Sequence, residues 1–253
     1  MLFGGTVRQI DDVKRLRSDG FEFGEIAFLS SRARHYWWES GLSNNGSDKF
    51  FLIAHGPHEE TEDDIAYLKN KHVPSIKATI DILCRMNITS LNIHLAMDKS
   101  VSRLVIDEKI NVLGELVEYA SKNNVLINLE NISETVHELE PAIAEISNLG
   151  LTLDTGHANL DTLENKSISI VRNLGKSIRH CHFHENLGGH MPHGDLHLPV
   201  GKGNIDFKSI IRELLTVDYK GTITLEASPE LQLVSMKNLE TIIKQIRGIS
   251  NEQ

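Results

Sequence analysis

Two segments, LINLEN (126–131) and LTLDTGH (151–157), decide the fold, because aliphatic and polar side chains alternate along both. In the first, Ile127 and Leu129 fall on one face of an extended chain and Glu130 falls on the other. The second repeats this order, with leucines on one face and a threonine and an aspartate on the other. Alternation with period two predicts strands that have one aliphatic face for covering helices and one polar face.

The same kind of run recurs along the chain, and a helical pattern follows most of the runs. We predict strands at 2–7, 21–28, 49–55, 90–96, 125–131, 151–155, 178–184 and 222–227. The clearest helical patterns cover 61–87, 107–124, 134–147, 207–217 and 236–247, and long loops are expected at 30–48 and 186–204. Eight strands alternating with helices in 253 residues predict an α/β fold, a (β/α)8 TIM barrel that forms a single domain over residues 1–253. An open, doubly wound sheet is the alternative.

Composition argues against several kinds of partner. The formal net charge of −9 gives no electrostatic footprint for nucleic acid or an anionic membrane. No apolar run reaches the roughly 18 residues that a membrane span needs. The first residues lack the basic and apolar segments of a secretory signal. We therefore expect a cytoplasmic protein with a small-molecule substrate and no membrane partner, and the sequence carries no prediction of its oligomeric state.

Side chains of the metal-ligand type lie near the C-terminal ends of the predicted strands. Six strands each place one such residue there, and three more residues follow in loops. The strand residues are His55, His94, Glu130, Asp154, His182 and Glu226, and the loop residues are His157, Asp195 and His197. Barrel enzymes build their active sites from the C-terminal ends of the strands. We therefore expect these nine side chains to converge at one barrel mouth.

Each residue taken alone has a simpler interpretation. A carboxylate such as Glu130 or Asp154 can cap a helix or a turn. His55 and His94 can be hydrogen-bonded structural imidazoles, and Asp195 can form an Asx turn. These interpretations are independent of one another, and all of them would have to hold together. Converging carboxylates and imidazoles without a cation would leave several buried charges unpaired, so we predict a divalent metal site.

Other histidines receive different interpretations. His180 shares a face with His182 but lies deeper, which predicts a polar residue of the core. His184 lies at the end of the same strand, where contact with a substrate is expected. His58 and His72 are predicted at the surface or in loops, with His58 closer to the site because its loop follows the third strand.

The chain resembles the xylose-isomerase-like barrel superfamily in seven segments: IAHGP, NIHLA, LEN, LDTGH, HFHEN, DLHLPVGKGNIDF and LEAS. This superfamily includes the endonuclease IV type of nuclease and many sugar isomerases and epimerases. In the isomerase and epimerase branch, the resemblance implies one metal held by Glu130, Asp154, His182 and Glu226. His157 would then help to bind the sugar, and the two glutamates would move a proton at carbon. In the nuclease branch, the resemblance implies three zinc ions on all nine residues.

Because the chain supplies all nine positions, we predict a multinuclear, metal-dependent hydrolase that resembles endonuclease IV, with Glu130, Glu226 and His157 as catalytic residues. Zinc is the expected metal, with manganese or iron as alternatives, and one to three ions are expected. The expected substrate is a small or medium phosphoester or sugar-containing compound. Duplex DNA is doubtful, because the segments after His94 and Asp195 lack the nuclease's proline–glycine turn and arginine.

Two alternatives stay open at this point. The first is a single-metal sugar or sugar-phosphate isomerase or epimerase, which predicts proton exchange at a carbon next to a carbonyl. The second is a non-catalytic protein that keeps the metal for structure. Several ions per chain would favour hydrolysis, and a single ion on the four core ligands would favour isomerisation.

Overall fold

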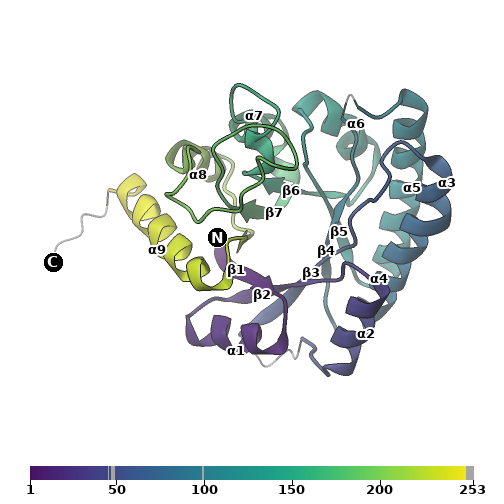
Figure 1. The fold of residues 1–253 in the computed structure, drawn as a ribbon, viewed down its shortest axis with the longest axis horizontal. Helices are drawn as coiled ribbons and strands as arrows, with labels where there is room; N and C mark the ends of the chain where they lie inside the picture. Colours follow the sequence, from purple (N-terminus) through teal and green to yellow (C-terminus); the bar gives the residue numbers. More distant parts are fainter. Residues whose placement is uncertain (45, 47–48, 99, 249–253) are drawn as a thin grey trace.

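Eight parallel strands close into a barrel in the computed structural model, which describes residues 1–44, 46, 49–98 and 100–248 (Figure 1). The strands follow one another around the barrel in chain order, and β8 closes it against β1. They are β1 (Leu2–Val7), β2 (Phe23–Ala27), β3 (Phe51–His55), β4 (Ser90–His94), β5 (Leu126–Glu130), β6 (Gly150–Asp154), β7 (Ile178–Phe183) and β8 (Thr222–Leu225). The predicted TIM barrel is therefore confirmed, and the open sheet is excluded.

Helices connect the strands and surround the barrel on its outside (Figure 1). The α-helices are α1 (Ile10–Ser18), α2 (Ser31–Glu39), α3 (Ile65–Tyr67), α4 (Val73–Arg85), α5 (Arg103–Lys122), α6 (Val136–Glu145), α7 (Ser167–Leu174), α8 (Phe207–Thr216) and α9 (Pro229–Ile246). Shorter turns of other helix types are η1 (Leu68–His72), η2 (His157–Asn159) and η3 (Gly175–Ser177). In the described ranges, no helix combines the length and the apolar character that crossing a bilayer requires.

The helical pattern predicted at 61–87 forms in three pieces. The short α3 leads into η1, a π-helical turn, and then into α4, which has Pro74 in its first turn. Proline has no N–H to donate along a helix, and the chain here passes through a wider turn in which the Val73 N–H reaches Leu68 O. His72 lies at the end of this turn and is only 1% exposed, so its predicted surface or loop position is wrong.

The segment 30–48, predicted as a long loop, contains the helix α2 instead. Ser30 caps this helix by accepting a hydrogen bond from the Ala33 N–H at 3.1 Å. Trp37 is buried and donates its ring N–H to Ala27 O at 3.1 Å. A single capping serine and one buried tryptophan are weak signals within polar flanking sequence, which explains the error. Residues 45 and 47–48 of this prediction lie outside the described residues.

The predicted alternation of strand faces is confirmed and gives the barrel a polar interior. Aliphatic residues such as Ile127 and Leu129 belong to the core beneath the helices. The opposite parity places polar side chains inside the barrel, each at most 2% exposed: Glu25, Asn92, Asn128, Thr152, His180 and Thr224. Bulky branched side chains dominate most TIM-barrel interiors. The polar layer below the mouth therefore departs from this common pattern.

The loop predicted at 186–204 is confirmed. It leads from β7 toward α8 and folds back where Glu185 and Leu198 form an isolated antiparallel bridge. This return places Asp195 within 3.7 Å of His157 and His197 within 3.9 Å of Glu226, measured between side-chain atoms. The loop therefore supplies one wall of the barrel mouth.

Candidate metal centre and active site

All nine predicted site residues meet at the C-terminal ends of the strands. The last residues of β3, β4, β5 and β6 are His55, His94, Glu130 and Asp154; His182 is next to last in β7, and Glu226 follows β8 directly. The strand register sets His94 beside Glu130 and Asp154 beside His182. His157, Asp195 and His197 join them from the loops after β6 and β7.

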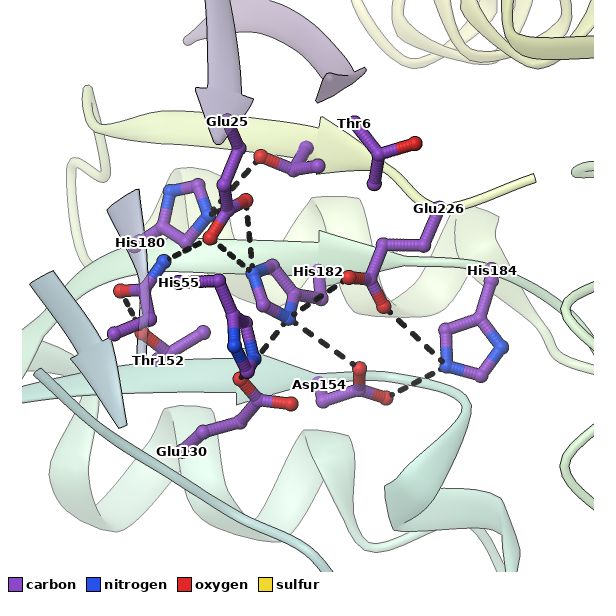
Figure 2. Close-up of polar contacts among 12 residues, drawn as sticks. Thr6, Glu25, His55, Glu130, Thr152, Asp154, His180, His182, His184 and Glu226 are labelled. Carbon is purple, nitrogen blue, oxygen red and sulfur yellow. Dashed lines mark hydrogen bonds and ion pairs between the residues drawn. The ribbon is translucent and has the colours of Figure 1, made fainter. Parts of the chain in front are cut away.

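The Nδ1 atom of His182 is the centre of this cluster (Figure 2). It lies 3.1 Å from Glu130 Oε2, 3.5 Å from Glu226 Oε1 and 3.7 Å from Asp154 Oδ2. His182, Asp154 and Glu130 are buried, and Glu226 lies at the edge of the pocket. Three carboxylates from the ends of three strands therefore face one imidazole nitrogen.

These four side chains fit a divalent cation. Glu130 Oε2, Asp154 Oδ2 and His182 Nδ1 are buried, yet none of them has a hydrogen-bond partner within the described part of the chain. Donor atoms that bind a cation at about 2.1 Å in tetrahedral or octahedral geometry lie roughly 3.0–3.4 Å apart. The distances around His182 Nδ1 are close to this range. Buried donors that face one point without satisfying each other are suited to hold a cation.

The ionisation states within the cluster depend on one another. Burial alone would raise the pKa of Glu130, but the nearby His182 and His94 imidazoles outweigh burial and hold that pKa well below its usual range. Burial alone would lower the pKa of His182, but Glu130 and Glu226 raise it well above its usual range. Glu130 is therefore ionised at neutral pH, which is the form that a metal ligand needs.

Three more imidazoles surround the carboxylate of Glu130. His94 Nε2 lies 3.0 Å from Oε1, His55 Nε2 lies 3.3 Å from Oε2, and His157 Nδ1 lies 3.4 Å from Oε1. These distances suit either a hydrogen bond to the carboxylate or a shared ion. The imidazoles by themselves therefore do not set the number of ions.

Asp154 also has the turn-capping role that the simpler interpretation assigned to it. Its Oδ1 accepts the His157 N–H at 2.6 Å, while its Oδ2 faces His182. Both interpretations hold together because the two carboxylate oxygens point to different partners. The cap also fixes His157 over the cluster, where its ring Nε2 lies 3.7 Å from Asp195 Oδ2.

His184 belongs to the cluster, although the sequence predicted only contact with a substrate. Its Nε2 lies 3.1 Å from Asp154 Oδ1, and its ring stacks on His197 with centroids 4.1 Å apart. The ring is fully buried, and neither of its nitrogens has a hydrogen-bond partner among the described residues. The parity of the strand was an available signal, because His184 lies two residues after His182.

Glu25 of β2 joins the cluster without having been predicted from the sequence. This residue is 2% exposed, and its Oε2 lies 3.1 Å from His182 Nε2 and 3.3 Å from His180 Nε2. An acidic residue on an otherwise apolar strand was its only signal. His180 is a polar core residue, as predicted, and His58 lies close to the site, as predicted, with its Nδ1 3.1 Å from His94 Nδ1.

A pocket of about 270 Å³ lies at the cluster. It is lined by His55, His58, Glu59, Glu62, His94, Glu130, Ile132, His157, Met191, Asp195, His197 and Glu226. Five of these residues are carboxylates and five are imidazoles, and the described lining contains no lysine or arginine. Ligand pockets commonly measure about 300–1,000 Å³, so this pocket suits a small, polar molecule.

Comparison with known proteins identifies the family of the chain. The family described as "Xylose isomerase-like TIM barrel" matches residues 42–247, which is most of the chain. The chain belongs to this family. The resemblance that rested on the seven metal-ligand segments is therefore confirmed.

Curated relatives of this xylose isomerase-like barrel include sugar epimerases. An uncharacterized protein of Methanocaldococcus jannaschii, MJ1311, is 32% identical over 158 residues, which cover 59% of this chain and 52% of that protein. L-ribulose 3-epimerase of Methylomonas sp. is 30% identical over 127 residues, 47% of this chain and 41% of that protein. Ketose 3-epimerase of Arthrobacter globiformis is 23% identical, over 85% of this chain and 76% of that protein. The chain thus spans about half the length of the first two relatives.

Solved structures share the fold of this barrel. A D-tagatose 3-epimerase-like protein has a TM-score of 0.78 at 23% identity, over 98% of this chain and 99% of that protein. D-allulose 3-epimerase from Methylomonas sp., solved in complex with D-allulose, has a TM-score of 0.71 at 19% identity, over 95% and 96%. The IolI protein with a bound zinc atom has a TM-score of 0.72 at 15% identity, over 97% and 99%. At these identities the likeness concerns the fold alone.

The prediction of a hydrolase is wrong. The relatives that are named for an activity, L-ribulose 3-epimerase and ketose 3-epimerase, are sugar epimerases. The expectation that the activity resembles that of endonuclease IV is therefore wrong as well. The physical reason lies in the imidazoles around Glu130. They were taken as evidence for several ions, whereas their distances of 3.0–3.4 Å to Glu130 equally suit ion pairs with that one carboxylate. A set of nine ligand-type residues therefore does not imply a multinuclear hydrolase.

Proposed function

We propose that this chain is a metal-dependent epimerase or isomerase that moves a proton on the carbon next to the carbonyl of a ketose. One observation carries the proposal. Two glutamates, Glu130 and Glu226, each place a carboxylate oxygen within 3.5 Å of the same atom, His182 Nδ1. Both can therefore reach one small substrate held at that point. The names of the curated relatives, L-ribulose 3-epimerase and ketose 3-epimerase, support the same chemistry.

Glu130, Asp154, His182 and Glu226 would hold the cation. When bound, a divalent metal supplies Lewis-acid polarisation of a carbonyl oxygen, which makes the adjacent C–H bond more acidic. Three carboxylates and one imidazole form an oxygen-rich donor set that suits manganese as well as zinc. His55, His94, His157, Asp195 and His197 would then line the substrate side of the centre.

The two glutamates would exchange the proton. One carboxylate takes the proton from the carbon while the C–H electron pair moves toward the carbonyl, and the second returns a proton to the other face of that carbon. This sequence inverts the carbon and leaves the carboxylates with the same number of protons as before. His157 is fixed by its backbone hydrogen bond to Asp154 and by its ring contact with Asn131 O at 3.1 Å. Its position in the pocket lining suits contact with a sugar hydroxyl.

The charge of the pocket favours an uncharged sugar over a sugar phosphate. Its lining includes Glu59 and Glu62 in addition to the carboxylates of the cluster, and no lysine or arginine lines it within the described chain. A phosphate group is normally bound by arginine, lysine or a helix N-terminus. Sugar hydroxyls, in contrast, can donate hydrogen bonds to carboxylates and imidazoles.

Deuterium uptake from heavy water tests this proposal. Protein loaded with Mn²⁺, Co²⁺ or Zn²⁺ is incubated with a panel of pentuloses and hexuloses, and proton NMR follows the signal of the carbon-bound hydrogen next to the carbonyl. We expect loss of that signal with at least one free ketose and much slower loss with the matching ketose phosphate. A panel in which no ketose exchanges under any of the three metals would overturn the proposal. Faster exchange with the phosphates would overturn the substrate class alone.

A further inference from the structure

Glu25 is a buried carboxylate to which the proposed reaction assigns no role. It comes from β2, and Figure 2 shows it on the opposite side of the His182 ring from Glu130 and Asp154. Its two oxygens lie 3.2 Å and 3.1 Å from His182 Nε2. The opposite ring nitrogen, Nδ1, faces the three carboxylates of the cluster. His182 therefore lies between one carboxylate on its inner side and three on its outer side.

A chain of hydrogen bonds fixes the position of Glu25. Asn92 Oδ1 accepts from Thr152 Oγ1 at 2.7 Å and from Asn128 Nδ2 at 3.1 Å. This orients the Asn92 amide so that its NH₂ group faces Glu25 and donates to Oε1. Glu25 must therefore accept at that oxygen, as an ionised carboxylate does. The polar layer of β4, β5 and β6 thus holds the carboxylate in place.

His180, the other imidazole partner of Glu25, does not depend on this carboxylate alone. Its Nδ1 lies 2.6 Å from Thr222 Oγ1, and its Nε2 lies 3.2 Å from Thr224 Oγ1 as well as 3.3 Å from Glu25. His182 Nε2, in contrast, has Glu25 as its one hydrogen-bond partner in the described part of the chain. The hydrogen bond that depends on Glu25 is therefore the one that His182 makes.

A neutral imidazole has an N–H donor on one ring nitrogen and a lone pair on the other. An acceptor that faces one nitrogen therefore keeps the proton there and leaves the lone pair on the opposite nitrogen. We propose that Glu25 is a positioning residue that holds the Nε2–H of His182, so that Nδ1 presents its lone pair to the cation of the proposed metal centre. This inference rests on the proposed function. Carboxylates that orient a ligating histidine in this way typically change metal affinity by about 10–100-fold when they are removed.

Glu25→Gln tests the role with the smallest change of shape. Three donors, from Asn92, His180 and His182, converge on Glu25, and a glutamine has only one acceptor oxygen and adds an NH₂ donor. The variant therefore cannot hold the Nε2–H of His182 without losing another partner. We expect the dissociation constant for Zn²⁺, measured by competition with a chromophoric chelator, to rise by about 10–100-fold.

His180→Gln is the matched control, because it alters the same buried group without removing the acceptor of His182. We expect it to lower the melting temperature of the metal-free protein but to leave the Zn²⁺ dissociation constant within about threefold of wild type. Equal Zn²⁺ affinity in wild type and Glu25→Gln, with only the melting temperature reduced, would mean that Glu25 is purely structural and would overturn the inference. The proposed reaction would still stand on its own deuterium test.

A second measurement needs no variant. In the wild-type protein loaded with Zn²⁺, nitrogen NMR of labelled histidine should show His182 bound to the metal through Nδ1 and protonated at Nε2. Ligation through Nε2 would overturn the inference while leaving the metal centre intact. A wild-type protein that binds no Zn²⁺ would overturn this inference and the proposed metal centre together.

Discussion

Replacing Lys109 with methionine should destabilise the barrel strongly and in a pH-dependent way. Lys109 lies on α5, and its side chain is fully buried. Its Nζ donates to Ala96 O at 2.6 Å and to Glu59 Oε2 at 2.9 Å, and the Glu59 side chain is only 2% exposed. Glu59 in turn accepts the Ala96 N–H at 3.1 Å. Methionine keeps most of the length of the lysine chain but removes its charge and its donors.

The size of the effect follows from the carboxylate that the substitution leaves behind. Removing one partner of a buried ion pair costs about 3–5 kcal/mol, because the remaining charge is buried without compensation. One kcal/mol shifts the melting temperature of a chain of this size by about 2–4 °C. We therefore expect Lys109→Met to lower the melting temperature by roughly 6–20 °C near pH 8.

The sign of the pH dependence follows from Glu59. Burial raises the pKa of Glu59 from 4.5 to about 7, even though Lys109 lowers it. A carboxyl group whose pKa is raised by folding favours the folded state when it is protonated. That contribution is fully present below the unfolded pKa and is lost as pH rises through the folded pKa. Without Lys109 the pKa of Glu59 rises further, so the variant keeps losing stability above about pH 7, where the wild type no longer does, and the difference between them should widen from about pH 6 to about pH 9.

Thermal unfolding followed by circular dichroism over this pH range measures the effect. Lys122→Met is the matched control, because it changes a lysine of the same helix whose partner, Glu118, is exposed. Exposed pairs of this kind contribute little to stability, so the control should shift the melting temperature by no more than roughly 2 °C at any pH. A Lys109→Met variant that matches this control near pH 8, or whose deficit does not change with pH, would refute the reasoning.

Three further predictions concern the site. Gly156→Ala should lose about 1–3 kcal/mol in thermal unfolding, because a Cβ there would overlap the buried ring of His184. Gly114→Ala, which has open space on α5, should instead gain about 0.5–1 kcal/mol. Zn²⁺ at about 100 times its dissociation constant should stabilise the protein by about 2.7 kcal/mol. A melting temperature that neither rises with Zn²⁺ nor falls again with a chelator would count against the metal centre. Glu226→Gln should slow deuterium exchange into the ketose by about 10²-fold or more, and an unchanged rate would remove Glu226 from the proton transfer.

The fold and the composition of the candidate site follow closely from local sequence. Alternation such as that of Ile127 and Leu129 with Asn128 depends only on neighbouring residues, so it is readable without any tertiary contact. The alternation along a parallel strand then determines which side chains face the barrel interior. A residue at the C-terminal end of a strand lies at the mouth of the barrel. For this reason the sequence already predicted that Glu130 and Asp154 would lie together at the mouth, as they do.

Contacts across the closed barrel were beyond the reach of local patterns. Glu25 lies 157 residues before His182 in the chain, and the two meet only because β2 and β7 face the same enclosed interior. Lys109 and Glu59 are 50 residues apart and form their buried pair between α5 and the loop that follows β3. The periodicity of the sequence does not predict contacts between residues so far apart in the chain.

The hydrolase prediction was wrong for the same reason, because it depended on contacts that only the folded chain defines. Residue type alone says that an imidazole can bind either a metal or a carboxylate, and the sequence cannot distinguish these roles for His55 or His94. The tertiary structure places both rings within 3.3 Å of the Glu130 carboxylate, where an ion pair with that one carboxylate accounts for them without a further metal ion. Local side-chain order determined which residues reach the barrel mouth. Closure of the barrel decided which atoms face each other there, because distances between strands far apart in the chain exist only in the folded state.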